Sequence, residues 1–277
     1  MTPPPCGESI APMAAPILET HNLRKEFGGL VAVADVSIQV EPGTLHAIIG
    51  PNGAGKTTLF NMLSGNLPPT RGRVFFKGQD ITDVPLHRRA HLGIGRSFQI
   101  TNVFPNLTVL ENVRLAAQAT EHDSLKFWRH YRHFDRFVRR ALEALALVGL
   151  DGKESLLASQ LPHGDKRKLE LAIILASDPE LLLLDEPTAG MASEQVPELM
   201  ETIKQIKATG GKAIMLVEHN MNVVMSFSDR ITVMHMGTVL TEGSPQEIAA
   251  NEAVQSAYLG EFYGDLRTLP GSAQEVR

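Results

Sequence analysis

Hydrophobic and polar residues alternate along the N-terminal part of the chain. Apolar residues occupy every second position over much of residues 31–40, and Leu45–Ile49 is apolar almost without interruption. Strict alternation is typical of a half-buried strand, whereas the unbroken run indicates a strand that is buried on both faces. With the turn Glu41–Gly43 between them, these patterns predict a strand, a turn and a second, fully buried strand.

Farther along the chain, the apolar pattern changes between the helical period and short buried runs. A strand is predicted near Arg73–Lys77, and a terminal hairpin is predicted from the turn Met236-Gly237, with a short helix after Ser244-Pro245. The predicted helices are Lys56–Ser64, Asp165–Ala176 and Glu194–Ala208. The predicted buried strands are Leu181–Leu184 and Ala213–Val217.

This order of elements predicts the fold class and the domain organisation. Strands that alternate with helices indicate an α/β fold with a mostly parallel sheet, and the N-terminal strands form an antiparallel β part. A mostly helical block at about residues 88–162 is predicted as a subdomain inserted into this core. Residues 1–16 and 261–277 are predicted to be tails, because they are rich in proline, alanine or polar residues, and residues 17–260 form one domain.

Composition narrows the class of protein. The 277 residues carry a net charge of −5 and an isoelectric point near 6.1, so bulk binding to nucleic acid is not expected. The single cysteine, Cys6, cannot form an intrachain disulfide. No apolar run reaches the ~18 residues that a transmembrane helix needs, and no signal peptide is recognisable. We therefore expect a cytoplasmic chain that reaches a membrane only through a partner.

A phosphate-binding loop is predicted between the buried strand Leu45–Ile49 and the following helix. Its sequence fits the pattern GxxxxGK[ST] in the strand–loop–helix context that distinguishes the motif from a chance glycine loop. Lys56 is expected to reach the β- and γ-phosphates, and the Thr57 hydroxyl to bind Mg²⁺. The residues predicted to bind nucleotide here are Gly50, Pro51, Asn52, Gly53, Ala54, Gly55, Lys56, Thr57 and Thr58.

Two carboxylates follow the buried strand Leu181–Leu184. The carboxyl ends of parallel strands form the ligand-binding edge of such sheets, so Asp185 is expected to bind Mg²⁺ directly or through water. Glu186 is then placed to orient and deprotonate an attacking water. The alternative is that both residues only cap a turn before Pro187.

Together these motifs resemble the ATP-binding subunits of ABC transporters. GPNGAGKTT corresponds to the Walker A loop, the segment Leu161–Glu170 to the signature motif, and LLLLDEP to Walker B. The resemblance implies that Gln99 is the Q-loop residue near Mg²⁺ and that His219 contacts the γ-phosphate. It also implies that Phe27 stacks on adenine, and that Gly164 binds ATP held by a second subunit of a head-to-tail dimer.

Finer features are similar to one branch of that family. The segments FGGLVAV, EPTAGM, VEHNMNVVM and AYLGEF resemble the paired ATPases of branched-chain amino acid importers and their urea and amide relatives. The resemblance implies ATP and Mg²⁺ as cofactors and transmembrane permease subunits as partners. It further implies a second ATPase subunit, an indirect periplasmic or extracellular solute-binding protein, and a peripheral position at the cytoplasmic face of the membrane. The solute itself is not encoded in this chain.

Three positions depart from the common family pattern. Pro162 and His163 replace the usual serine and first glycine of the signature motif, and Ala192 replaces the usual aspartate of the D-loop. Gly164 and the helix start are retained, so backbone N–H groups could still hold phosphate. We hypothesise that the two ATP sites are unequal and that this chain pairs with a different ATPase.

Two other functions are compatible with parts of the sequence. One alternative is a non-transport ABC ATPase that acts on ribosomes or DNA, although the chain has a single Walker A motif and no sustained heptads. Another is a nucleotide-binding regulatory module without turnover. The aromatic and basic segment at residues 126–140 fits either a lipid-contacting helix or an ordinary helix that packs its apolar stripe inward, and the second is favoured.

Overall fold

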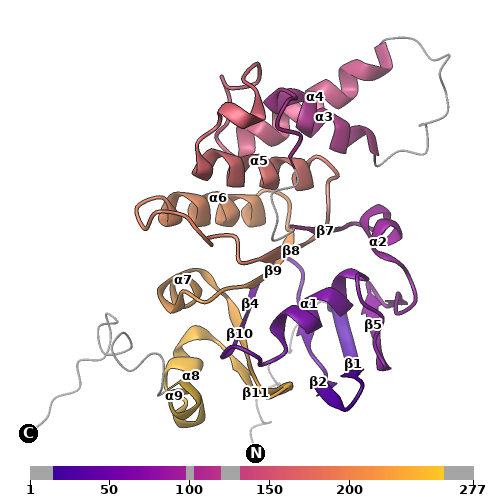
Figure 1. Ribbon diagram of the computed structural model, residues 1–277, viewed down its shortest axis with the longest axis vertical. Coiled ribbons are helices and arrows are strands. Elements are labelled where there is room, and N and C mark those ends of the chain that lie inside the picture. The colour runs from indigo at the N-terminus through magenta and orange to yellow at the C-terminus, as the bar shows by residue number, and fades with distance from the viewer. Residues whose placement is uncertain (1–14, 98–102, 120–131, 259–277) are drawn as a thin grey trace, which may run out of the picture.

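The computed structural model describes residues 15–97, 103–119 and 132–258, without the side chains of residues 132–134 and 258. The described residues form two β-sheets with helices packed around the larger one (Figure 1). The smaller sheet lies beside β4 (Leu45–Ile49) and α1 (Lys56–Ser64), and the helices between residues 109 and 208 lie toward the opposite end of the molecule.

The smaller sheet is antiparallel throughout. Its order is β2-β1-β5-β6, and β3 also pairs with β1. The alternating stretch at residues 31–40 was predicted as one strand, and this is wrong because the chain breaks it into two separate strands, which pair with β1 at different registers. The strands are β1 (Leu18–Phe27), β2 (Leu30–Val36), β3 (Gln39–Val40), β5 (Arg71–Phe76) and β6 (Gln79–Asp80).

The larger sheet has the order β11-β10-β4-β9-β8-β7, and its strands are parallel except for β11. This confirms the predicted α/β class with a mostly parallel core and an antiparallel N-terminal part. The strands beyond β4 are β7 (Ile94–Arg96), β8 (Leu181–Asp185), β9 (Ala213–Val217), β10 (Arg230–His235) and β11 (Thr238–Gly243).

Strand β7 is one of the elements that the sequence pattern missed. The range from residue 88 was expected to be mostly helical, yet Ile94–Arg96 pairs in parallel with β8 at the edge of the larger sheet. Three residues are too few to show a period of two. The backbone also approaches closely here, because a Cβ at Gly95 would lie 2.5 Å from the Ile174 side chain.

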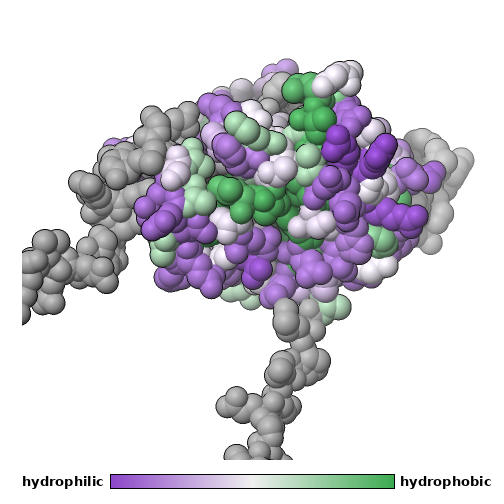
Figure 2. Space-filling model, turned by 90° about the horizontal axis from the view of Figure 1, so that it is seen from below, coloured by the Kyte–Doolittle hydropathy of each residue, from purple (hydrophilic) through white to green (hydrophobic). Residues whose placement is uncertain are grey.

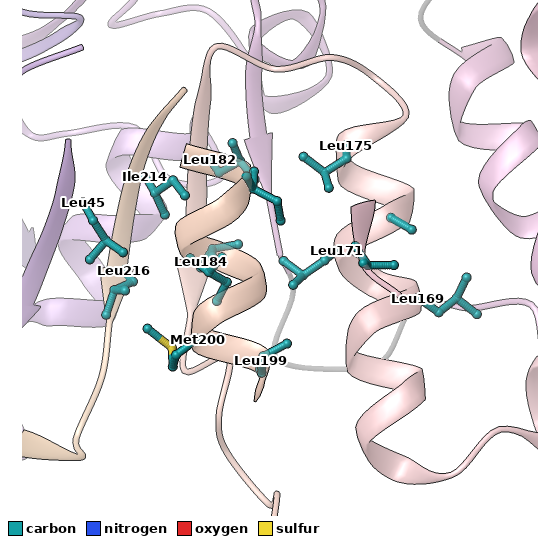
Figure 3. Packing of buried hydrophobic residues seen from close by; sticks show 14 of the residues in the cluster. Leu45, Leu169, Leu171, Leu175, Leu182, Leu184, Leu199, Met200, Ile214 and Leu216 are labelled. Carbon is teal, nitrogen blue, oxygen red and sulfur yellow. The ribbon is translucent and has the colours of Figure 1, made fainter. Parts of the chain in front are cut away.

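The central strands separate two hydrophobic cores. All five residues of β4, β8 and β9 are buried, and successive residues enter opposite cores because side chains alternate across a sheet. Leu182 and Leu184 face α5 (His163–Leu175) and α6 (Val196–Ala208), as Figure 3 shows, whereas Leu181 and Leu183 join the core beneath α1. The phosphate loop therefore follows a strand that is buried on both faces, and Asp185 is the last residue of another such strand.

The remaining helices extend from this core. Helices α3 and α4 pack against each other and against α5. In α4, Phe137 is buried and Arg139 is exposed, which agrees with inward packing of the apolar stripe; Phe127, Trp128 and Tyr131 lie outside the described residues. Within the described ranges, no helix is long and apolar enough to cross a bilayer. These helices are α2 (Leu86–Leu92), α3 (Val109–Ala119), α4 (Arg132–Leu147), α7 (Met221–Phe227), α8 (Pro245–Ala249) and α9 (Glu252–Tyr258).

Candidate functional site

The phosphate loop connects the buried strand β4 to α1. The loop folds around the Lys56 ammonium group, which donates hydrogen bonds to the carbonyls of Gly50 at 2.6 Å and Pro51 at 3.1 Å. The first turn of α1 follows immediately, so its unpaired N–H groups and its dipole are directed at the loop. This arrangement can hold a phosphate group.

Backbone from two other elements braces this loop. A Cβ at Gly55 would lie 2.4 Å from the Ala32 carbonyl oxygen of β2, and a Cβ at Gly50 would lie 2.3 Å from the Met234 carbonyl oxygen of β10. The turn between β10 and β11 is bonded to both sides, since Gly237 N donates to Ala54 O at 3.1 Å and Gly237 O accepts from Ala34 N at 2.7 Å. Only glycine fits at these contacts.

A groove of about 560 Å³ runs from the phosphate loop to the tip of the smaller sheet. Phe27, at the end of β1, lines it and is 48 % exposed, with the Lys25 ammonium 5.4 Å from its ring centre. Leu30 and Met236 line the same groove and are 66 % and 79 % exposed. Figure 2 shows hydrophobic side chains gathered in the middle of the face at this end of the molecule. The mouth of the groove is thus apolar, whereas its inner end is polar.

Asp185 lies at the carboxyl end of β8 and is almost fully buried. Burial raises its pKa, and the Arg96 guanidinium, with a nitrogen 3.7 Å from Oδ2, opposes that rise. Arg96 also donates to Ser64 Oγ and, at 2.7 Å, to Asn61 Oδ1, so it ties Asp185 to the C-terminal half of α1. Sequence reasoning missed Arg96, because an arginine in a three-residue strand gives no pattern.

The Asp185 carboxylate has free acceptor capacity. Among the described residues, neither of its oxygens accepts a hydrogen bond, although both are buried. A buried carboxylate without hydrogen bonds is costly, and a cation or a metal-bound water would satisfy it. Thr57, exposed at the start of α1, lines the adjacent groove. These oxygen groups fit Mg²⁺, which prefers oxygen ligands and retains several waters.

Glu186 and His219 come together on the wall of the groove. His219 Nε2 and Glu186 Oε1 are 2.8 Å apart, and both side chains are partly exposed to the groove. The two residues follow neighbouring parallel strands, β8 and β9, whose carboxyl ends meet at one edge. Glu186 has a φ of 48°, an unusual backbone conformation for a residue other than glycine.

The residue before His219 is a further member of the site that the motifs did not single out. Glu218 is 4 % exposed, and its Oε1 accepts hydrogen bonds from Thr188 N at 2.9 Å and from Thr188 Oγ1 at 2.8 Å. Its Oε2 accepts from His219 N at 3.2 Å. The VEHN sequence shows an acidic residue beside the histidine, but only the structure shows that its carboxylate is turned inward.

The signature segment begins α5 two residues earlier than predicted, at His163 instead of Asp165. The first helical hydrogen bond runs from Lys166 N to Pro162 O. The N–H groups of His163, Gly164 and Asp165 therefore lie outside the helical ladder and are directed away from the helix end. No residue of α5 is among the described residues that line the groove.

The structure brings together most of the residues that were predicted from the sequence. The groove is lined by Phe27, Asn52, Gly53, Ala54, Gly55, Lys56, Thr57, Thr58, Glu186 and His219. Asp185 lies one residue before Glu186, at the end of β8, and Gly164 begins a separate helix. Gln99 lies outside the described residues.

Comparison with known proteins identifies relatives of this arrangement. The ABC transporter family model matches residues 33–189, and the model for branched-chain amino acid ATP-binding cassette transporters matches residues 238–263. The chain is 38 % identical to the Escherichia coli high-affinity branched-chain amino acid transport ATP-binding protein LivG, over 90 % of this chain and 100 % of LivG. It is 37 % identical to Pseudomonas aeruginosa BraF, a protein described in the same words, over the same shares.

Solved structures give the same result. The ADP conformation of MJ1267, described as an ATP-binding cassette of an ABC transporter, has a TM-score of 0.77 and 29 % identity, covering 90 % of this chain and all of that one. The dimeric structure of MJ0796, a bacterial ABC transporter cassette, has a TM-score of 0.70 and 27 % identity, covering 82 % and 98 %. The similarity therefore extends over most of the chain and is not confined to one motif.

Proposed function

This chain belongs to the ABC transporter family, and we propose that it is the ATP-hydrolysing subunit of an importer for branched-chain amino acids or similar small polar solutes. The single observation that carries the proposal is the groove in which the phosphate loop, Glu186 and His219 lie beside the exposed ring of Phe27. Nucleotide binding and hydrolysis need these groups on one wall.

Each residue of the groove has a separate role in ATP binding or hydrolysis. The base of ATP stacks on Phe27, while Lys56 and the backbone N–H groups of the loop hold the phosphates. Glu186 accepts a proton from the attacking water, and His219 holds the Glu186 carboxylate and contacts the γ-phosphate. Hydrolysis of this kind depends mainly on positioning and charge stabilisation, so a single well-placed carboxylate is enough.

We propose Thr57, Asp185 and Gln99 as the residues that hold Mg²⁺. The metal would neutralise charge on the β- and γ-phosphates. The unsatisfied, buried oxygens of Asp185 support this assignment, and Arg96 keeps that carboxylate in place beside α1.

The assembly is also a proposal. Two ATPase subunits close head to tail, so that Gly164 and the free N–H groups at the start of α5 bind ATP held by the partner. Pro162, His163 and Ala192 lack the side-chain contacts usual at this interface, which favours pairing with a different ATPase over a homodimer. The pair would drive transmembrane permease subunits at the cytoplasmic face, with a solute-binding protein outside.

Transport reconstitution tests the proposal. The permease that co-purifies with this chain would be placed in liposomes, and ATP hydrolysis would be measured with leucine, isoleucine, valine, urea or an amide, each with its binding protein. Stimulation by one solute class, together with uptake of that solute, is the expected result. ATP hydrolysis that no permease or solute alters, but that ribosomes or DNA stimulate, would favour the non-transport alternative.

The pairing has its own test. Glu186→Gln should slow hydrolysis and trap the ATP-bound dimer, which size-exclusion chromatography detects. A purified chain that forms a cooperative ATP-dependent homodimer by itself would contradict the heterodimer. Dimer formation only after a second ATPase is added would support it.

A further inference from the structure

The loops that follow β8 and β9 are joined by the buried carboxylate of Glu218. This side chain is almost inaccessible to solvent, and it lies between Thr188, two residues after Glu186, and the backbone of His219. In the part of the chain that the structure describes, no lysine, arginine or histidine side chain forms an ion pair with it. Its charge is instead satisfied by three hydrogen bonds from neutral donors.

Burial of a carboxylate in this way costs free energy that only good hydrogen bonds offset. An apolar residue could fill the same space without that cost. All three donors of Glu218 belong to the two loops that carry Glu186 and His219, and none belongs to the cores on either side of the sheet. The carboxylate therefore fixes the two loops relative to each other.

The backbone of Glu186 needs such support. Its φ of 48° is energetically unfavourable for a residue with a side chain. On one side, Glu186 N donates to Val217 O at 3.0 Å, and on the other, Thr188 is bound to Glu218. The residues Val217 and Glu218 thus hold both ends of the turn that presents the Glu186 carboxylate to His219 at 2.8 Å.

We propose that Glu218 is a positioning residue for ATP hydrolysis: it sets the distance and orientation of Glu186 and His219 without touching the nucleotide. This inference rests on the proposed ATPase function and adds a residue to its mechanism. Glu218 does not line the nucleotide groove, so its loss should affect the chemical step and leave ATP binding intact.

Glu218→Gln is the decisive variant. The amide keeps the size of the side chain and one acceptor oxygen, but it removes the charge and one of the two acceptors. In the assembled ATPase pair with MgATP, we expect kcat to fall about ten-fold or more, whereas KM and ATP affinity change by less than about two-fold. Glu201→Gln, an exposed carboxylate on α6, is the matched control and should change neither parameter.

Thr188 gives an independent check of the same contact. Thr188→Ser keeps both donors and should keep activity, and Thr188→Val removes only the hydroxyl donor and should lower kcat less than Glu218→Gln does. The effects of Thr188→Val and Glu218→Gln should be non-additive in the double variant, because the two side chains are directly hydrogen-bonded to each other.

Two results would overturn the inference. One is a folded Glu218→Gln chain with unchanged kcat. The other is a parallel fall of kcat, ATP affinity and melting temperature, which would make Glu218 a general structural support. The ¹⁵N shift of the His219 ring provides a readout that needs no turnover, and Glu218→Gln should move it as Glu186→Gln does. A wild-type ATPase pair that binds ATP without hydrolysing it would contradict the proposed function, and this shift would then decide the inference.

Discussion

The two parts of this chain proposed to contact ATP are built with different tolerance for substitution. At the phosphate loop, a Cβ on Gly50 or Gly55 would meet backbone oxygen atoms of other strands at 2.3 and 2.4 Å. At the start of α5, a Cβ on Gly164 would first meet the end of the Gln195 side chain at 3.1 Å. Backbone cannot move away as a flexible side chain can. The loop is therefore rigidly specified, whereas the signature segment can vary, as Pro162 and His163 do.

Removal of the Glu186 carboxylate should have the largest effect on activity. Glu186→Gln is expected to slow ATP hydrolysis about 100-fold or more, because the groove loses its proposed general base, while ATP binding is retained. Single-turnover hydrolysis and equilibrium nucleotide binding measure the two effects. Glu194→Gln, at an exposed position between β8 and α6, serves as the control. A Glu186→Gln chain with normal turnover would remove Glu186 from the mechanism.

Glycine substitutions test the contrast directly. Gly55→Ala combines a φ of 96° with the overlap on Ala32 O, so its melting temperature should fall by about 10 °C or more, or the chain should fail to fold. Gly164→Ala lies in a helix, where alanine is favoured by up to about 1 kcal/mol, and should change the melting temperature by no more than about 3 °C. Equal losses in the two variants would refute the difference in rigidity.

The apolar mouth of the groove should affect affinity more than turnover. Phe27→Ala is expected to weaken ATP binding about ten-fold, because the base loses its stacking partner. Met236→Asn should weaken it by only about three-fold, and it suits the positive φ of 47° at this turn position. Binding of tripolyphosphate, which has no base or ribose, should be unchanged in both. A matching loss of tripolyphosphate affinity would mean that the loop itself had been disturbed.

Restoring the common signature pattern should have the smallest effect. In the double variant Pro162→Ser, His163→Gly, we expect kcat to change by less than about three-fold, because in the proposed dimer backbone N–H groups at the start of α5 would already bind the partner's phosphate. The measurement is steady-state hydrolysis by the assembled ATPase pair. A gain of more than about ten-fold would show that the missing serine hydroxyl limits hydrolysis at this site.

The sequence predicted the phosphate loop and its neighbours better than the residues that support them. The fully apolar runs of β4, β8 and β9 and the fixed spacing of the phosphate loop identified both the fold class and the groove residues. Strand β7 and Arg96 escaped prediction because three residues carry no period. Glu218 escaped for another reason: inward and outward orientations of a polar side chain after a strand look the same in sequence.

The turn at Gly237 has a consequence for the order in which the protein matures. The phosphate loop is complete only when Ala54 O accepts from Gly237 N, and these residues are far apart in the chain. A ribosome has therefore released most of the domain before the loop can take its final shape. A nascent chain that ends before β10 should have every residue of the phosphate loop and still lack a formed nucleotide site. ATP binding would then report that synthesis and folding of the whole domain are finished.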